Sequence, residues 1–145
     1  MNLSDMENED LFNLMCGKVL GRGAYRTVYS CPIREDWVVK LDTCENFSNI
    51  CEYQIYRELQ DTPIGKWLAP VRWVSAKGMW LIQDKTEPIQ RKQMPKKIPS
   101  LFADIKLDNW GMLKGRPVCH DYGNNYVYEL AGKHGRKLKK APSFS

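Results

Sequence analysis

Residues 18–42 read KVLGRGAYRTVYSCPIREDWVVKLD, and this stretch decides how the first half of the chain is expected to fold. Gly21 and Gly23 fall between two short runs with β-branched and aromatic residues, which predicts two strands joined by a glycine-rich turn. A compact apolar strand follows over residues 36–42. Such a turn lets backbone N–H groups approach a phosphate closely, but it is also common in ordinary hairpins.

A helix is expected over residues 46–60, and it carries a carboxylate on its apolar side. At about 100° per residue, Ile55 and Leu59 share one face, and Glu52 lies near the middle of that face. Burying a carboxylate alone is costly, so Glu52 needs a partner. Lys40, which closes the preceding apolar strand, is the natural candidate. The pair has either a functional role or a purely structural one, and a lysine at a strand end can also simply reach water.

The rest of the chain is expected to contain short elements. Residues 71–76 and 79–83 predict two more strands, so the first half is α+β with three strands, one helix and two strands. Three prolines over residues 88–99 argue against a long helix there, and a short helix is expected to start near Ser100. A hairpin that turns at Lys114-Gly115 is expected, with strands Gly111–Leu113 and Pro117–Cys119.

Three oxygen-bearing side chains occupy two neighbouring loops of the second half. Asp104 and Asn109 lie in ADIKLDNWG, and Asp121 lies in HDYG beyond the expected hairpin. Asn and Asp oxygens on adjacent loops can hold Mg²⁺, which prefers oxygen ligands and keeps some water. A separate carboxylate can orient or deprotonate a hydroxyl nucleophile.

Composition and charge describe an ordinary globular protein of one-domain length. The chain has 145 residues, of which 43% are hydrophobic and 27% charged, and its net charge is +5. Basic residues within 131–145 supply that whole excess, which favours a solvated, frayed tail or a phosphate-attracting one over a uniformly basic nucleic-acid binder.

No stretch approaches the roughly 20 apolar residues of a membrane helix. Acidic residues precede the first basic residue, Lys18, which is unlike a secretory signal, so a cytoplasmic location is expected. The five cysteines include no CxxC pair and are expected to be free thiols.

Five segments, in order, resemble the motifs of the protein-kinase-like family. They are GRGAYRTV at 21–28, WVVK at 37–40, the helix with Glu52, DIKLDN at 104–109 and DYG at 121–123. Their counterparts are the G-x-G-x-x-G-x-V loop, V-A-I-K, the helix glutamate, the D-L-K-P-E-N half of the catalytic loop and D-F-G. The small size and the N-W-G sequence also resemble the short kinase-like proteins of bacteriophages. The resemblance implies a five-stranded antiparallel N-lobe with one helix and a severely truncated C-lobe.

The resemblance also implies ATP and Mg²⁺ as cofactors and a role for each matching residue. Lys40, held by Glu52, contacts phosphates, Asp104 orients the acceptor hydroxyl, and Lys106 accompanies it in the catalytic loop. Asn109 and Asp121 bind Mg²⁺. The remaining cofactor-binding residues come from the glycine-rich turn, the two adenine-flanking valines and the segment Asp84–Thr86, and they are Gly21, Gly23, Tyr25, Arg26, Val28, Val38 and Asp84.

The departures from the family pattern are equally specific. Arg26 stands where the third glycine of the loop is usual, and it either crowds the phosphates or binds them. Only residues 124–145 follow D-Y-G, which leaves no room for an activation segment. The expected division is an acidic flexible N-terminus at 1–12, an N-lobe at 13–84, a minimal C-lobe with the catalytic and metal loops at 85–130, and a basic tail at 131–145. Apolar surface near Trp110, Tyr122, Tyr126 and Tyr128 is then expected to stay exposed unless a homodimer or a partner protein covers it.

Several functions stay open from the sequence. The first is transfer of the γ-phosphate of ATP to a protein hydroxyl, because Lys106 is the residue type of protein kinases at that place. The alternative is a catalytically inactive, pseudokinase-like module that binds and regulates a host or partner protein. Binding of nucleic acid through the basic segments is less favoured. An unrelated α+β domain with coincidental motifs is the remaining reading.

Overall fold

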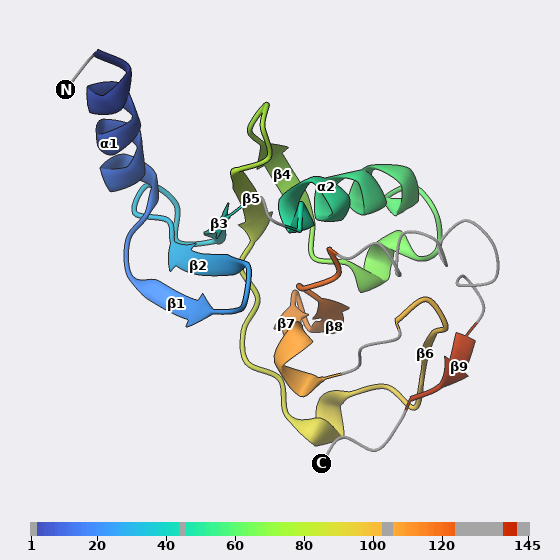
Figure 1. Cartoon of the computed structure of the whole chain (residues 1–145). Coiled ribbons are helices and arrows are strands. Elements are labelled where there is room, and N and C mark those ends of the chain that lie inside the picture. The colour runs from blue at the N-terminus through green and yellow to red at the C-terminus, as the bar shows by residue number, and fades with distance from the viewer. Residues whose placement is uncertain (1–2, 44–45, 103–105, 124–137, 142–145) are drawn as a thin grey trace.

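The computed structural model describes residues 3–43, 46–102, 106–123 and 138–141 (Figure 1). Its main element is a five-stranded antiparallel sheet with strand order β1-β2-β3-β5-β4. The strands are β1 Val19–Arg22, β2 Arg26–Ser30, β3 Trp37–Asp42, β4 Val71–Val74 and β5 Trp80–Asp84. The five strands expected from the sequence are therefore confirmed, because runs of β-branched, aromatic and apolar residues between glycine or proline breaks favour strands.

Helix α2, Ser48–Leu59, packs on one face of this sheet (Figure 1). Its buried Ile55 and Leu59 join Leu81 of β5 in the main core. Val38 and Lys40 of β3 point away from Val39, since successive strand residues alternate between faces. The register pairs Lys40 with Leu81, so Lys40 lies on the α2 side of the sheet.

Helix α1, Leu3–Met15, is an element that the sequence analysis missed. The N-terminus was expected to be loosely held because of its acidic, polar composition, but the segment is helical and its last turn is anchored. The ring of Phe12 lies edge-on to Tyr29 and Trp80, with centroids 5.6 and 6.1 Å apart. Met15 completes this second core, which lies on the face opposite to α2, and Figure 1 shows the sheet between the two helices.

The second half forms two small antiparallel sheets. The expected hairpin is confirmed as β7 Trp110–Leu113 and β8 Arg116–Cys119, with positive φ at Lys114 (52°) and Gly115 (78°). Residues 131–145 were expected to be a solvated, frayed tail or a phosphate-attracting one, and most of them lie outside the described residues. Within the described part, β9 Leu138–Lys140 pairs with β6 Lys97–Pro99, because a non-local partner supplies backbone hydrogen bonds despite the basic side chains. Residues 100–101 are a turn, not the start of the expected helix, and 3₁₀ turns occur at Gly65–Trp67, Arg91–Gln93 and Leu107–Asn109.

Both halves share one hydrophobic core. Trp110 and Tyr122, which the sequence analysis expected to be exposed, are 3% and 1% exposed, while Tyr126 and Tyr128 lie outside the described residues. The reason is direct packing: Phe102 and Trp67 meet Trp110 edge-on, and Leu68 forms a bridge to Cys119 of β8. No helix in the described part of the chain is long and apolar enough to cross a membrane.

Cys16, Cys31 and Cys119 are buried free thiols, as expected from the sequence for these three positions.

Candidate functional site

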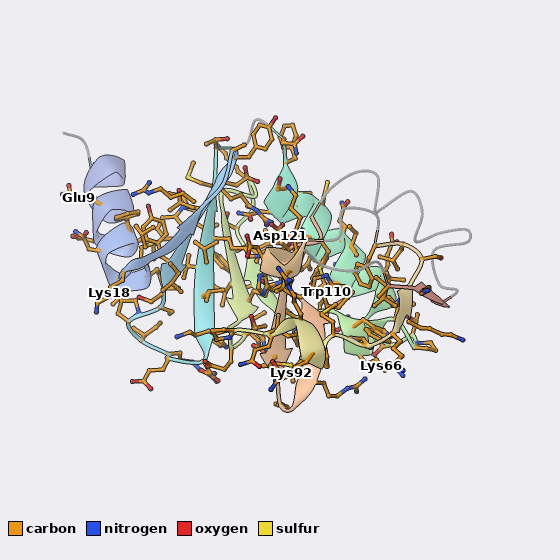
Figure 2. The ribbon with its side chains drawn as sticks, turned by 90° about the horizontal axis from the view of Figure 1, so that it is seen from below. Glu9, Lys18, Lys66, Lys92, Trp110 and Asp121 are labelled. Carbon is orange, nitrogen blue, oxygen red and sulfur yellow. The ribbon has the colours of Figure 1, made fainter. Side chains whose placement is uncertain are left out.

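A cavity of about 730 Å³ opens beneath the glycine-rich turn, where the sheet meets the second half. Its size falls in the range of small-molecule sites. Figure 2 shows Asp121 near the middle of the molecule, between the sheet and the hairpin that carries Trp110. The sequence-predicted residues that line the cavity are Gly21, Gly23, Tyr25, Arg26, Val28, Val38, Lys40, Asp84, Lys106, Asn109 and Asp121. Asp104 lies outside the described residues.

Lys40 and Glu52 form the ion pair that the sequence predicted. Lys40 Nζ lies 2.5 Å from Glu52 Oε1, and both side chains are almost completely buried. Lys40 Nζ also donates to the backbone carbonyl of His120. Because His120 precedes Asp121, this contact ties the end of β3 to the loop after β8.

Glu52 stands behind Lys40 and is the centre of a buried polar network. Its carboxylate accepts from Arg26 Nη1 and Nη2 at 3.2 and 3.1 Å, and from the Tyr122 backbone N–H at 3.0 Å. Gln83 Nε2 adds a longer contact of 3.4 Å. A buried carboxylate with this many donors fixes the strand, the helix and the Asp121 loop relative to one another.

Arg26 lines the cavity, and its guanidinium is bound by carboxylates. Its Nη2 lies 2.5 Å from Asp121 Oδ1, and its Nη1 donates to Asn49 Oδ1 at 3.3 Å in addition to its two contacts with Glu52. The side chain of Arg26 is 10% exposed, whereas that of Asp121 is 52% exposed. The guanidinium therefore bridges a buried carboxylate and one that faces the cavity.

The charges of this network shift the titration of its members in predictable directions. Burial alone would raise the pKa of Glu52, but the charges of Arg26 and Lys40 outweigh it and hold that pKa at about 2. Burial lowers the pKa of Lys40, with partial compensation from Glu52. Burial also opposes the charge of Arg26, yet Glu52 and Asp121 keep the pKa of Arg26 above its usual value.

Asn109 and Asp121 lie on adjacent loops, because the His120 backbone N–H donates to the Asn109 carbonyl at 2.8 Å. The ring of His120 joins the same loops: Nε2 lies 2.7 Å from the Asp108 carbonyl oxygen and Nδ1 lies 2.8 Å from Thr86 Oγ1. Both ring nitrogens are thereby engaged, and burial, with the nearby charge of Lys40, lowers the pKa of His120.

The oxygen donors of these loops are too few to hold Mg²⁺ alone, but they fit a Mg²⁺ ion that a bound ligand also coordinates. The donors are the Asp121 carboxylate and the side-chain amide of Asn109, which are hard oxygen-type ligands. Within the described residues there is no group of three or more His, Cys, Asp or Glu side chains placed to hold a metal ion alone. Mg²⁺ commonly combines one or two protein ligands with phosphate oxygens and water, and this donor set fits that pattern.

The segment Asp84–Thr86, which was expected to contact the base, begins with the last residue of β5. The Asp84 side chain does not point freely into the cavity, because Arg72 binds it at 2.7 and 2.6 Å. Its backbone N–H donates to Pro70, and that of Lys85 donates to Asp36. The backbone N–H of Thr86 takes part in neither of these two hydrogen bonds.

Sequence reasoning missed several residues that build the site. Asn49 donates through Nδ2 to the carbonyls of Lys40 and Met79, both at 3.0 Å, and so anchors the start of α2 to the sheet. Asn49 lies three residues before Glu52 and therefore on the same helix face, and this spacing could have indicated from the sequence that Asn49 belongs to the site. The contributions of His120 and Tyr122 depend on long-range contacts and left no such signal in the sequence.

Comparison with known proteins gives limited similarity. No protein-family model matches the chain, and no curated protein sequence matches it. One similar solved structure is the streptomycin–ATP–APH(2")-IIa ternary complex, with 23% sequence identity and a TM-score of 0.43. The match covers 64% of this chain and 32% of that one, so the chain spans about a third of the length of that structure.

Proposed function

We propose that this chain is a kinase-like protein that binds ATP with Mg²⁺ in the cavity and transfers the γ-phosphate to a protein hydroxyl. The observation that carries the proposal is the gathering of residues from separate sequence motifs around one cavity. Gly21 and Gly23, Lys40, Asn109 and Asp121 all line it, although they come from opposite ends of the described sequence. If the motifs resembled the family by chance, the fold would have no reason to bring these residues together around one cavity.

The phosphates are proposed to lie beneath the glycine-rich turn, next to Lys40. An ammonium group has three N–H donors. Glu52 and the His120 carbonyl take two of them, so the third can donate to a phosphate oxygen. An added Cβ at Gly21 would meet no atom within 4 Å, which supports open space at the turn.

The adenine is proposed to lie deeper, against Val28 and Val38. These two residues sit on neighbouring strands, and both line the cavity. The Thr86 backbone is proposed to donate to the edge of the base, since the N–H groups of Asp84 and Lys85 are used elsewhere. This arrangement supports an apolar slot with one directional polar contact, which is common in nucleotide sites.

Transfer would then depend on positioning and charge, as phosphoryl transfer usually does. Asp104 is proposed to orient the acceptor hydroxyl, and Lys106, which lines the cavity, to face the transferring group. Mg²⁺, held by Asn109 and Asp121 with the phosphates, would supply charge stabilisation.

The alternative function is a non-catalytic module that uses nucleotide as a structural ligand and acts by binding a partner protein. The observation that favours it is the engagement of Asp121 by Arg26 at 2.5 Å, which leaves that carboxylate partly neutralised. Incubation with radiolabelled ATP and candidate proteins separates the two functions. Transfer by the wild type that Asp104→Asn abolishes supports the enzyme, while binding without any transfer supports the module.

Nucleotide binding itself is tested by thermal unfolding with ATP and Mg²⁺. At a hundredfold excess over Kd, binding stabilises the folded chain by about 2.7 kcal/mol, which raises Tm by roughly 5–15 °C for a domain of this size. Lys40→Ala, which removes the cation placed next to the phosphates, is expected to reduce the rise, whereas Lys66→Ala, at an exposed position away from the cavity, should keep it. A folded wild type whose Tm does not respond to ATP would refute the proposal.

A further inference from the structure

The position of Arg26 has a consequence for how the cavity handles divalent cations. We propose that the Arg26 guanidinium takes one of the cation positions at Asp121, so that nucleotide binding depends only weakly on Mg²⁺. This inference rests on the proposed function, because it concerns how the same cavity binds a nucleoside triphosphate. It goes further in assigning part of the cation's role to a residue of the chain itself.

The geometry fixes the guanidinium at this point. Its two contacts with Glu52 are parallel, each Nη atom facing one carboxylate oxygen, and Asn49 holds Nη1 from the side. Bidentate pairs of this kind add geometric specificity as well as energy. With Arg26 held by α2, Nη2 is aimed at Asp121 Oδ1, which lies 2.5 Å away. One oxygen of Asp121 is thereby occupied from within the protein.

The charge balance of the site also supports a weak dependence of nucleotide binding on Mg²⁺. Two cations, Arg26 and Lys40, face two buried or half-buried carboxylates, Glu52 and Asp121. The charges of these four groups therefore sum to zero before any ligand enters. With a neutral residue at position 26 the site would lose one positive charge beside Asp121, and a divalent cation would have more negative charge to compensate when a phosphate chain binds.

Two independent effects of Arg26 thus reduce the dependence on Mg²⁺. The guanidinium supplies positive charge next to the phosphates in the absence of metal, and it competes with a metal ion for Asp121 Oδ1. A neutral side chain at position 26 should weaken nucleotide binding without Mg²⁺ and leave Asp121 more available to the ion. The coupling between nucleotide and Mg²⁺ should therefore increase.

A purely structural role for Arg26 predicts something different. If Arg26 only holds the glycine-rich turn, α2 and the Asp121 loop together, its loss should weaken nucleotide binding by the same factor with and without Mg²⁺. The ratio of the two dissociation constants separates these cases, because it cancels any uniform damage to the cavity. This ratio, Kd in EDTA divided by Kd in Mg²⁺, is the coupling factor between nucleotide and metal.

The experiment measures this ratio with a fluorescently labelled ATP analogue for the wild type, Arg26→Gln and Arg26→Lys. Coupling factors between two ligands typically range from about 5 to about 150. The wild type is expected to give a ratio below about 5, and Arg26→Gln a ratio roughly tenfold higher. Arg26→Lys keeps the charge while losing the bidentate geometry, and its ratio should stay near that of the wild type.

The possible outcomes separate a failure of this inference from a failure of the proposed function. A high ratio in the wild type, or equal ratios in the wild type and Arg26→Gln, would overturn the inference while leaving nucleotide binding intact. If Arg26→Gln does not fold by circular dichroism, the wild-type and Arg26→Lys ratios still decide the question, since a high value in either contradicts the proposal. Failure of the folded wild type to bind the analogue under either condition would instead refute the proposed function and the inference with it.

Discussion

Replacing Glu52 by Gln is the sharpest perturbation of the network, because it removes one charge with little change of shape. In the wild type the carboxylate compensates two buried cations, Arg26 and Lys40, at distances of 2.5–3.2 Å. A Gln side chain keeps one acceptor oxygen, but its NH₂ group would face donors. The variant therefore leaves buried positive charge without adequate compensation.

The expected cost follows from the burial of the pair. Breaking a buried ion pair by removing one partner costs about 3–5 kcal/mol. Native domains are stable by about 5–15 kcal/mol in total, so Glu52→Gln should lose a large part of its folding free energy. Glu35→Gln is the matched control, because Glu35 is exposed on the surface, and its effect should stay within about 0.5 kcal/mol.

Urea denaturation followed by tryptophan fluorescence measures both free energies, since the chain has five tryptophans and Trp110 is buried. A double-mutant cycle with Lys40→Met isolates the pair. The double variant should be less destabilised than the sum of the single variants by about 1 kcal/mol or more, because it also removes the Lys40 charge that Glu52→Gln leaves without its partner. A loss below about 1 kcal/mol for Glu52→Gln, or strict additivity in the cycle, would show that the network does not hold the site together.

Three further predictions test the packing and charge around the site. The pKa of Glu52 is depressed to about 2 from an ordinary 4.5, which should contribute folding stability on the order of 3 kcal/mol. This contribution is fully present above about pH 4.5 and is lost as the pH falls toward 2. Urea midpoints measured over acid pH should show the loss in the wild type and a flatter profile in Glu52→Gln. Gly111→Ala should destabilise the fold by about 1–3 kcal/mol, because a Cβ there would overlap the Thr86 side chain; an unchanged urea midpoint would contradict that packing. Tyr122→Phe should cost only about 1 kcal/mol, since it removes the 2.8 Å hydrogen bond to the Ala69 carbonyl while a Gln83 contact to that oxygen remains; a calorimetric loss well above this value would indicate a larger role for the hydroxyl.

The sheet and the ion pair could be predicted from the sequence because local patterns specify them. Runs of β-branched, aromatic and apolar residues between breaks indicated the five strands, and Glu52 on an apolar helix face required a cation, for which Lys40 was the nearest candidate. The contact between Arg26 and Asp121 joins positions 95 residues apart, and no local pattern encodes it. It became predictable only once the fold had brought the turn and the loop together.

The elements that sequence reasoning missed depend on tertiary contacts. Helix α1 has a polar composition, and Phe12 and Met15 anchor it only because the opposite face of the sheet offers Tyr29 and Trp80. Strand β9 carries basic side chains that suggest a solvated tail, but β6 provides its backbone partner. Burial of Trp110 likewise follows from packing between the two halves of the chain.

The central claim is that the cavity binds a nucleoside triphosphate, and an amide NMR titration with ATP and Mg²⁺ tests both the binding and its place. The account predicts that the perturbed backbone amides cluster at Gly21, Gly23, Thr86 and Asp121, with little change at Trp73 on the outer strand β4. An unperturbed spectrum of the folded protein, or changes confined to residues away from the cavity, would contradict it.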